Sequence, residues 1–282
     1  MNESHRAKGI VLAVLGVLVL IPDALLVRLI ATNPATLLFW RGLLMGLSMF
    51  AFLIFFRKIK PATIRKDFSF YLLSGLLLSG ATCFFVLSIT ATKVANTLFI
   101  LSTTPIIAAL LTKIVYSDKI SRNTWITMIF CFSGVGIMTI KDVETTAFLG
   151  NLAALGAACF HAGNFTLLRK AKNADIMLAV ALSGGIVAVV SFFFATPFSI
   201  PGPDIVYMGI LGIIILPVSF GLLTYAPQFV SPVDVSLIML LETVLSPLLV
   251  WIVLGESMTV YGITGGVIVL LSLLAYIIYR RF

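Results

Sequence analysis

Long apolar runs separated by short polar stretches form most of this chain. A helix that crosses a bilayer needs roughly 20 mostly apolar residues, and charged residues recur here at about that interval. The pattern predicts an all-α integral membrane protein, and the short connections leave no room for a soluble domain. The ten predicted transmembrane helices are 9–27, 35–56, 68–92, 94–112, 123–140, 145–168, 176–196, 205–226, 235–255 and 257–279.

Composition and charge support this prediction. The 282 residues are 60% hydrophobic and 11% charged, whereas about a quarter of a soluble domain is charged. With ten spans, nearly all basic residues lie on one side, and only Lys93 and Lys141, with Arg28 nearby, lie on the other. The positive-inside rule then predicts cytoplasmic termini, so the net charge of +8 indicates topology and not nucleic-acid binding. Short loops favour the plasma membrane of a bacterium, its inner membrane.

Motifs for catalysis, nucleotides or metals are absent from the sequence. Cys83, Cys131 and Cys159 lie within spans without a CxxC pair, and His5 and His161 are too few for a metal site. There is no Walker loop, GxGxxG, HExxH or GxSxG. We therefore expect no enzyme activity, no cofactor and no bound metal.

The two halves of the chain show a weak internal repeat. Residues 8–28 align with 149–169, and residues 95–118 align with 233–256. Transporters built from inverted repeats need an odd number of helices in each repeat, and ten spans divide into five and five. The pattern predicts repeats at 1–144 and 145–282. The aligned pairs include Gly9 with Gly150, Asp23 with Asn164, Arg28 with Arg169, Asn96 with Asp234, Thr104 with Glu242, and Asp118 with Glu256.

Four motifs give the chain a family resemblance. They are FWRG (39–42), ATKVANTLFILSTTPIIAALL (91–111), SPVDVSLIMLLETVLSPLLVWIVLGE (231–256) and GVGIMTI (134–140). In their order and spacing, the chain resembles the ten-helix EamA-type branch of the drug/metabolite transporter (DMT) superfamily. The resemblance implies two inverted five-helix repeats around a central cavity. It also implies secondary transport, often export, of small organic molecules such as amino acids. YSDK (116–119), where a Gly-Glu pair is common, and Thr243, where proline is usual, depart from the pattern.

Three ionisable residues, Arg41, Glu242 and Asp23, lie inside predicted spans. A charge at the bilayer centre costs about 2.5–3.5 kcal/mol on insertion scales, so each should face a cavity or a partner. Arg41 either binds a carboxylate of the substrate or the protein, or reaches to head groups or helix carbonyls. Glu242 carries a proton, binds a substrate ammonium, pairs with Arg41, or bonds a neighbouring helix. Asp23 marks a binding site or gate at a helix break, or a surface pair with Arg28.

Other polar and aromatic residues extend the set of candidates. Hydroxyls around Pro105 either line a path or bond to their own backbone, and His161 shares a helical face with Asn164, for proton transfer or interhelical bonding. Prolines free backbone carbonyls and predict broken or bent helices. The candidates for substrate binding or coupling are Arg41, Glu242, Asp23, Asn96, Thr103, Thr104, His161, Asn164, Trp40 and Tyr225, and those for helix breaks or gating are Pro22, Pro105, Pro217 and Pro247.

These residues predict a secondary active transporter that works by alternating access. Arg41 can bind a substrate carboxylate, and Glu242 or Asp23 can bind a substrate amine. Together they favour a small polar or zwitterionic metabolite, first of all an amino acid or derivative. Coupling to protons or to exchange is expected because no nucleotide site is visible. A lipid flippase and a non-transporting scaffold are the alternatives. The GxxxG of Gly262 and Gly266 predicts either a dimer face or internal packing, which leaves monomer and homodimer open.

Overall fold

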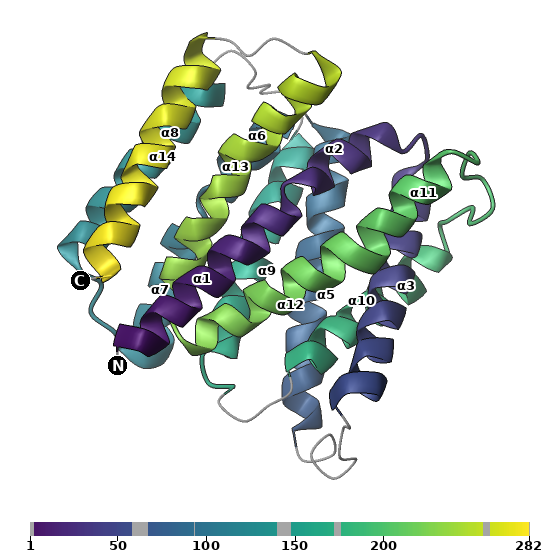
Figure 1. Ribbon diagram of the computed structural model, residues 1–282, viewed down its shortest axis with the longest axis horizontal. Coiled ribbons are helices and arrows are strands. Elements are labelled where there is room, and N and C mark those ends of the chain that lie inside the picture. Colours follow the sequence, from purple (N-terminus) through teal and green to yellow (C-terminus); the bar gives the residue numbers. More distant parts are fainter. Residues whose placement is uncertain are drawn as a thin grey trace.

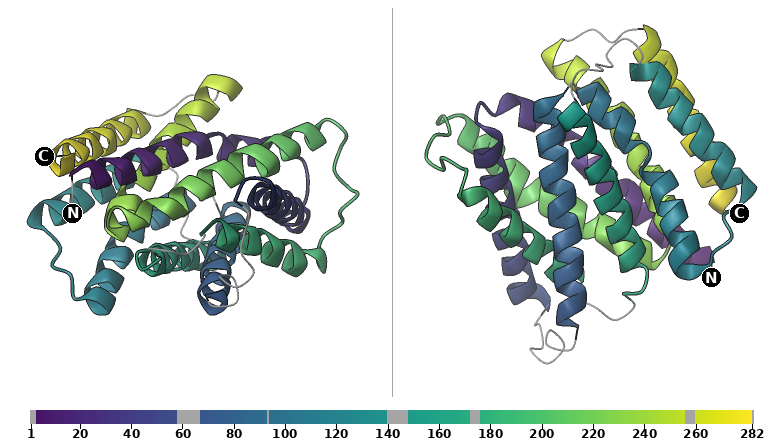
Figure 2. Two further views of the ribbon diagram at one scale, coloured as in Figure 1. Left: turned by 60° about the horizontal axis from the view of Figure 1, so that its bottom comes forward. Right: turned by 180° about the vertical axis from the view of Figure 1, so that it is seen from behind.

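The chain folds into one bundle of helices lying side by side (Figures 1 and 2). The computed structural model describes residues 3–57, 67–92, 94–139, 148–171, 176–255 and 260–281, and every regular element in these ranges is a helix. The elements are α1 (Glu3–Leu20), α2 (Pro22–Leu29), α3 (Pro34–Phe52), η1 (Leu53–Arg57), α5 (Phe68–Ala91), α6 (Val94–Leu101), α7 (Thr104–Tyr116), α8 (Arg122–Thr139), α9 (Phe148–Leu168), α10 (Ile176–Phe192), α11 (Asp204–Gly209), η2 (Ile210–Ile215), α12 (Leu216–Tyr225), η3 (Ala226–Gln228), α13 (Pro232–Leu254) and α14 (Val260–Arg281).

The helices follow the apolar runs of the sequence. Within the described ranges, seven segments are long and apolar enough to cross a membrane, and α10 is apolar but shorter, at 17 residues. Large apolar side chains also cover the outside of the bundle; Ile114, Phe193 and Leu149, for example, are each 77% exposed. Such a surface suits lipid, and the chain is a multi-pass membrane protein. The seven segments are His5–Val27, Pro34–Phe56, Phe68–Ala91, Thr97–Tyr116, Asp204–Gln228, Pro232–Val253 and Val260–Tyr279.

Three of the four predicted helix breaks coincide with changes in the backbone. Pro22 begins α2 directly after α1 ends, Pro105 lies in the first turn of α7 after α6 ends, and Pro217 follows the π-helix η2. Pro247 is different, because α13 runs without interruption from Pro232 to Leu254. Of the expected break or bend, the break does not occur, because a proline removes one backbone hydrogen bond and the surrounding turns hold the helix together; a bend stays a prediction.

The most extensive helix contacts join residues 3–139 to residues 148–281. α3 packs on α10 at one edge of the bundle, and α8 packs on α14 at the other (Figures 1 and 2). Between them, α5 packs on α9, α1 packs on α12, and α7 packs on α13. The two halves of the chain therefore interlock, and the space between them lies inside the bundle.

Glycines bring the backbones of both edge pairs close together. A Cβ added at Gly184 of α10 would lie 2.5 Å from the backbone nitrogen of Gly46 and 2.6 Å from the carbonyl oxygen of Gly42, both on α3. On α14, Gly265 meets the carbonyl of Gly134 in α8 in the same way. Small residues at helix contacts allow such approach in membrane proteins. These glycines therefore serve packing within one chain.

The α3–α10 contact gives a prediction with a matched control in the next residue. We expect Gly184→Ala to destabilise the protein by about 1–3 kcal/mol, because its methyl group meets backbone atoms that cannot turn aside. Gly185→Ala should be neutral or slightly stabilising, because its Cβ would have no neighbour within 4 Å and alanine favours helix. Thermal unfolding of both variants in detergent measures the difference, and equal stability would contradict the proposed close contact.

Candidate functional site

The break between α1 and α2 places a carboxylate inside the bundle. Pro22 begins α2, and Asp23 follows in its first turn, where the helix dipole favours a negative charge. The hydroxyl of Ser246 in α13 donates a hydrogen bond of 3.1 Å to the carbonyl of Ile21 at the break. The break is thus fixed against α13, and Asp23 is only 3% exposed.

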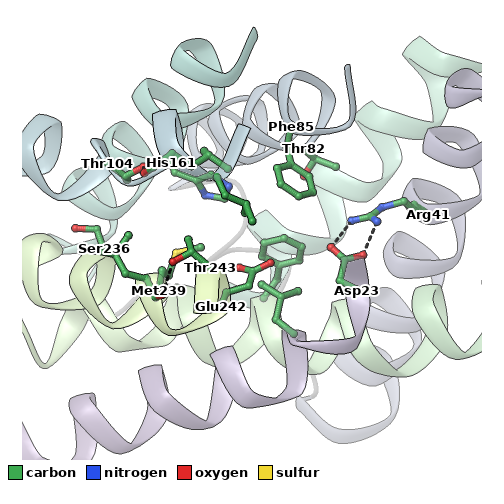
Figure 3. Close-up of a pocket in the computed structure, with 15 residues that line it drawn as sticks. Asp23, Arg41, Thr82, Phe85, Thr104, His161, Ser236, Met239, Glu242 and Thr243 are labelled. Atoms are coloured by element: carbon green, nitrogen blue, oxygen red, sulfur yellow. Dashed lines mark hydrogen bonds and ion pairs between the residues drawn. The ribbon is translucent and has the colours of Figure 1, made fainter. Parts of the chain in front are cut away.

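Arg41 of α3 binds Asp23 through both ends of its guanidinium group. Its Nη1 lies 2.5 Å from Oδ1 of Asp23, and its Nη2 lies 3.0 Å from Oδ2 (Figure 3). Arg41 is 2% exposed, so the expectation that it reaches to lipid head groups was wrong. The burial of Asp23 likewise excludes a surface position, and the side chain of Arg28 lies outside the described residues. Arg41 and Asp23 form a buried, bidentate ion pair.

Glu242 of α13 faces the same interior space. Its carboxylate points toward the cavity that Asp23 and Arg41 also line (Figure 3), and its charge interacts with the charges of both. Among the described residues, Glu242 has no hydrogen bond or ion pair, so the predicted pairing with Arg41 is not formed. Because Asp23 and Arg41 neutralise one another, an ionised Glu242 gives this group of three a net charge of −1.

A cavity of about 60 Å³ lies between the two halves of the chain. One buried water needs at least about 10–15 Å³ on this measure, so the space holds a few waters or the polar end of a small molecule. Its walls are mostly apolar, with a few polar side chains, as is typical of small-molecule sites. The lining residues are Leu20, Asp23, Arg41, Thr82, Phe85, Leu98, Leu101, Thr104, His161, Phe220, Ser236, Met239, Leu240, Glu242 and Thr243.

Two of the neutral polar lining residues carry atoms without a partner. Nδ1 of His161 and Oγ1 of Thr82 are buried and make no hydrogen bond within the described part of the chain. A buried polar atom left in this state costs about 1–3 kcal/mol. Thr104 differs, because its hydroxyl donates a 2.6 Å bond to the carbonyl of Leu101. The cavity therefore has an unpaired carboxylate and two neutral side chains with unsatisfied polar atoms along its wall.

Four predicted site residues lie away from the cavity. The Trp40 ring nitrogen donates to the carbonyl of Pro197 at 2.8 Å, and Tyr225 stacks on a phenylalanine. The hydroxyl of Thr103 donates to the backbone, and Asn164 accepts a 2.7 Å hydrogen bond from Ser74. The bond of Asn164 joins α9 to α5, which is the interhelical alternative that we gave for it, and the bond of Thr103 is the backbone alternative that we gave for the hydroxyls around Pro105. The side chain of Asn96, also predicted, lies outside the described residues.

Sequence reasoning missed several residues of the cavity wall. Ser236, Met239 and Thr243 follow one another at spacings of three and four residues on α13, and Met239 lies three residues before Glu242, so periodicity could have found this face. Thr82 and Phe220 carry no such signal, because they reach the cavity only through the packing of α5 and α12 against other helices.

The chain after α7 and after α9 lies at the end of the bundle near the termini, and the chain after α2 and after α10 lies at the opposite end (Figures 1 and 2). Polar contacts join the two halves at both ends. Near the chain termini, Arg169 at the end of α9 forms an ion pair with Asp118 after α7. At the other end, Thr196 bonds to Asn33 at 2.9 Å and donates its backbone N–H to Thr36 at 2.8 Å. Polar contacts therefore join the two halves of the chain at both ends of the bundle, and the cavity lies between these ends.

Comparison with known families shows what kind of protein has this architecture. The model of the EamA-like transporter family matches residues 7–140 and again residues 148–278. The chain belongs to this family. It is thus a member of the DMT superfamily, as the sequence motifs indicated, and a membrane transporter. Membership of a transporter family fits the expectation of a protein that is not an enzyme.

Individual relatives of this EamA-like transporter agree with the assignment. The uncharacterized transporter YyaM of Bacillus subtilis (strain 168) is 27% identical over 115 residues, which are 40% of this chain and 38% of YyaM. The alignment therefore spans less than half of either protein. One crystal structure of a protein has the same fold, with a TM-score of 0.82, 14% sequence identity, and coverage of 98% of this chain and 100% of that chain.

Proposed function

We propose that this EamA-like transporter is a secondary active transporter of a small polar metabolite with an ammonium group, such as an amino acid or a derivative. The observation that carries this proposal is the Glu242 carboxylate, which faces a cavity between the halves and has no partner among the described residues. A substrate ammonium or a proton would neutralise it, but not both at once. Binding of the two in turn would couple transport to protons or to exchange of one substrate for another.

We infer that residues 1–144 and 145–282 are two inverted five-helix repeats. The family model matches once in each half. The contact of α1 with α12 corresponds to that of α9 with α5 when the halves are exchanged, and the α3–α10, α7–α13 and α8–α14 contacts each correspond to themselves. The aligned glycines also match: Gly9 faces Phe229 and Val230, and Gly150 faces Ala91 and Thr92. Each of these observations is expected if a two-fold axis relates the repeats.

The repeat proposal sets the topology. In it, α8, α9 and α10 cross the membrane together with the seven longer apolar segments, which makes ten crossings. The side with most basic residues is cytoplasmic and holds both termini, and we place the protein in the inner membrane of a bacterium. The end with Asp118 and Arg169 is then the cytoplasmic one, and the end with Asn33 and Thr196 is external. Breaking the cytoplasmic contacts would open the cavity to the cytoplasm, and breaking the external contacts would open it to the outside. Opening the two ends in turn is alternating access.

Counterflow into proteoliposomes tests the proposed function. Vesicles that contain the purified protein are loaded with one unlabelled compound, and uptake of a trace of the same labelled compound is followed. The compounds are valine, valinol and serine, with isovalerate as a control that lacks an ammonium group. We expect uptake above that of protein-free vesicles for at least one compound with an ammonium group. Uptake of none of them, together with movement of a fluorescent phospholipid between leaflets, would replace this proposal with the flippase.

A further inference from the structure

The unsatisfied atoms of the cavity wall point to the kind of ligand that it holds. His161 and Thr82 are only 8% and 6% exposed, and both line the cavity. Nδ1 of His161 and Oγ1 of Thr82 find no partner among the described residues. Buried polar atoms are costly in this state, so a bound molecule or water would complete their hydrogen bonds. Neither side chain carries a fixed charge of the kind that attracts an anion, and each suits a neutral hydroxyl or amide.

The same cavity has little to offer a substrate carboxylate. Nη1 and Nη2 of Arg41 each donate one hydrogen bond to Asp23, so the charge of Arg41 is already balanced, and its Nε has no partner in the described part of the chain. The guanidinium group keeps N–H groups beside Nε that Asp23 does not use, but a carboxylate bound there would meet no unbalanced positive charge. The carboxylates of Asp23 and Glu242 would in addition repel a second anion. The balance of charge in the cavity therefore disfavours a substrate carboxylate at Arg41, and that predicted role stays untested.

The cavity is better suited to a cationic group than to a carboxylate. The Glu242 carboxylate has no partner among the described residues, and it lies in the same space as His161 and Thr82 (Figure 3). Charge-assisted hydrogen bonds from an ammonium group to a carboxylate are among the stronger ones. The rings of Phe85 and Phe220 in the wall provide apolar contact for a short carbon chain.

We propose that the cavity binds a small primary amine with a neutral hydrogen-bonding group, such as an amino alcohol, in preference to an α-amino acid. Glu242 binds the ammonium group, and His161 hydrogen-bonds the hydroxyl. This inference rests on the proposed function and narrows its substrate class from amino compounds in general to those without a carboxylate.

Four ligands with one carbon skeleton test the inference on the unmodified protein. They are valinol, valine, isovalerate, and the amine in which hydrogen replaces the hydroxyl of valinol. Affinities are measured by calorimetry in detergent. We expect valinol to bind at least about tenfold more tightly than valine, which corresponds to one charge-assisted contact, and isovalerate not to bind. Binding of valine at least as tight as that of valinol, or binding of none of the four, overturns the inference.

The outcome for valine separates this inference from the proposed function. If valine binds more tightly than valinol and shows counterflow, the transporter of amino compounds stands and the preference for amino alcohols falls. If no compound with an ammonium group binds or exchanges, both fall.

The role of His161 has a test that is independent of folding. In His161→Gln and His161→Ala, we expect the affinity for valinol to fall roughly 3- to 10-fold, as for one neutral hydrogen bond. The affinity for the amine without the hydroxyl should stay unchanged, because that ligand never makes the bond. A structural defect would weaken both ligands alike, and that result would remove His161 from the binding site.

Discussion

Glu242→Gln abolishes transport of compounds with an ammonium group while the protein still folds. Glutamine has nearly the same shape as glutamate, but it can neither carry a proton nor pair with a cation. Loss of a hydrogen bond to a charged group weakens binding by roughly 10- to 150-fold. Stability should be kept or even raised, because the substitution removes a charge that has no partner among the described residues. Counterflow and thermal unfolding measure the two effects separately.

Ser236→Ala is the matched control for this substitution. Ser236 lies on α13 and lines the same cavity, but its hydroxyl donates to the carbonyls of Pro232 and Val233 in its own helix. Its removal should change transport little. If Glu242→Gln transports as well as Ser236→Ala does, the carboxylate is not needed and the proposed function loses its main support.

Arg41→Met destabilises the protein by about 3–5 kcal/mol, because it leaves the carboxylate of Asp23 buried without a partner. The double variant Arg41→Met/Asp23→Leu removes both charges and should recover most of this loss, since apolar residues of similar volume often replace a buried ion pair without cost. Unfolding of the wild type, both single variants and the double variant in mixed micelles gives the coupling free energy.

Ligand binding by the double variant distinguishes two roles for the ion pair. If Arg41 and Asp23 only hold α3 against α2, the double variant keeps its affinity for valinol. If Arg41 contacts the substrate, that affinity falls even though stability returns. A double variant no more stable than Arg41→Met alone would mean that the two side chains do not compensate one another.

The sequence predicted where the helices lie better than it predicted the site. The helices follow apolar runs whose ends are marked by charges, and Pro22 and Pro105 mark real interruptions. Both features depend on residues close together in the chain. The pairing of Arg41 with Asp23 does not, because it depends on how α3 approaches the break between α1 and α2. Trp40 and Asn164 were placed in the site for their chemistry alone, although their partners, Pro197 and Ser74, lie far away in the sequence.

Glu242 was recognised for a local reason. No basic residue lies near it in the sequence, and a lone carboxylate in an apolar run is unusual. Thr82 had no comparable signal, since a hydroxyl in such a run usually bonds to its own helix. A charge without a partner can therefore be found from sequence, whereas the neutral groups around it need the packing.

The contact between Gly134 and Gly265 has a consequence for how the protein is made. α14 leaves the ribosome after α8, and its Gly265 meets a glycine of α8 that was synthesised about 130 residues earlier. At a synthesis rate of about 5–20 residues per second, Gly265 is made roughly 7 to 26 seconds after Gly134. During that interval the narrow glycine face of α8 stays open to lipid or to other newly made chains. Translation that stalls before α14 would leave this face uncovered.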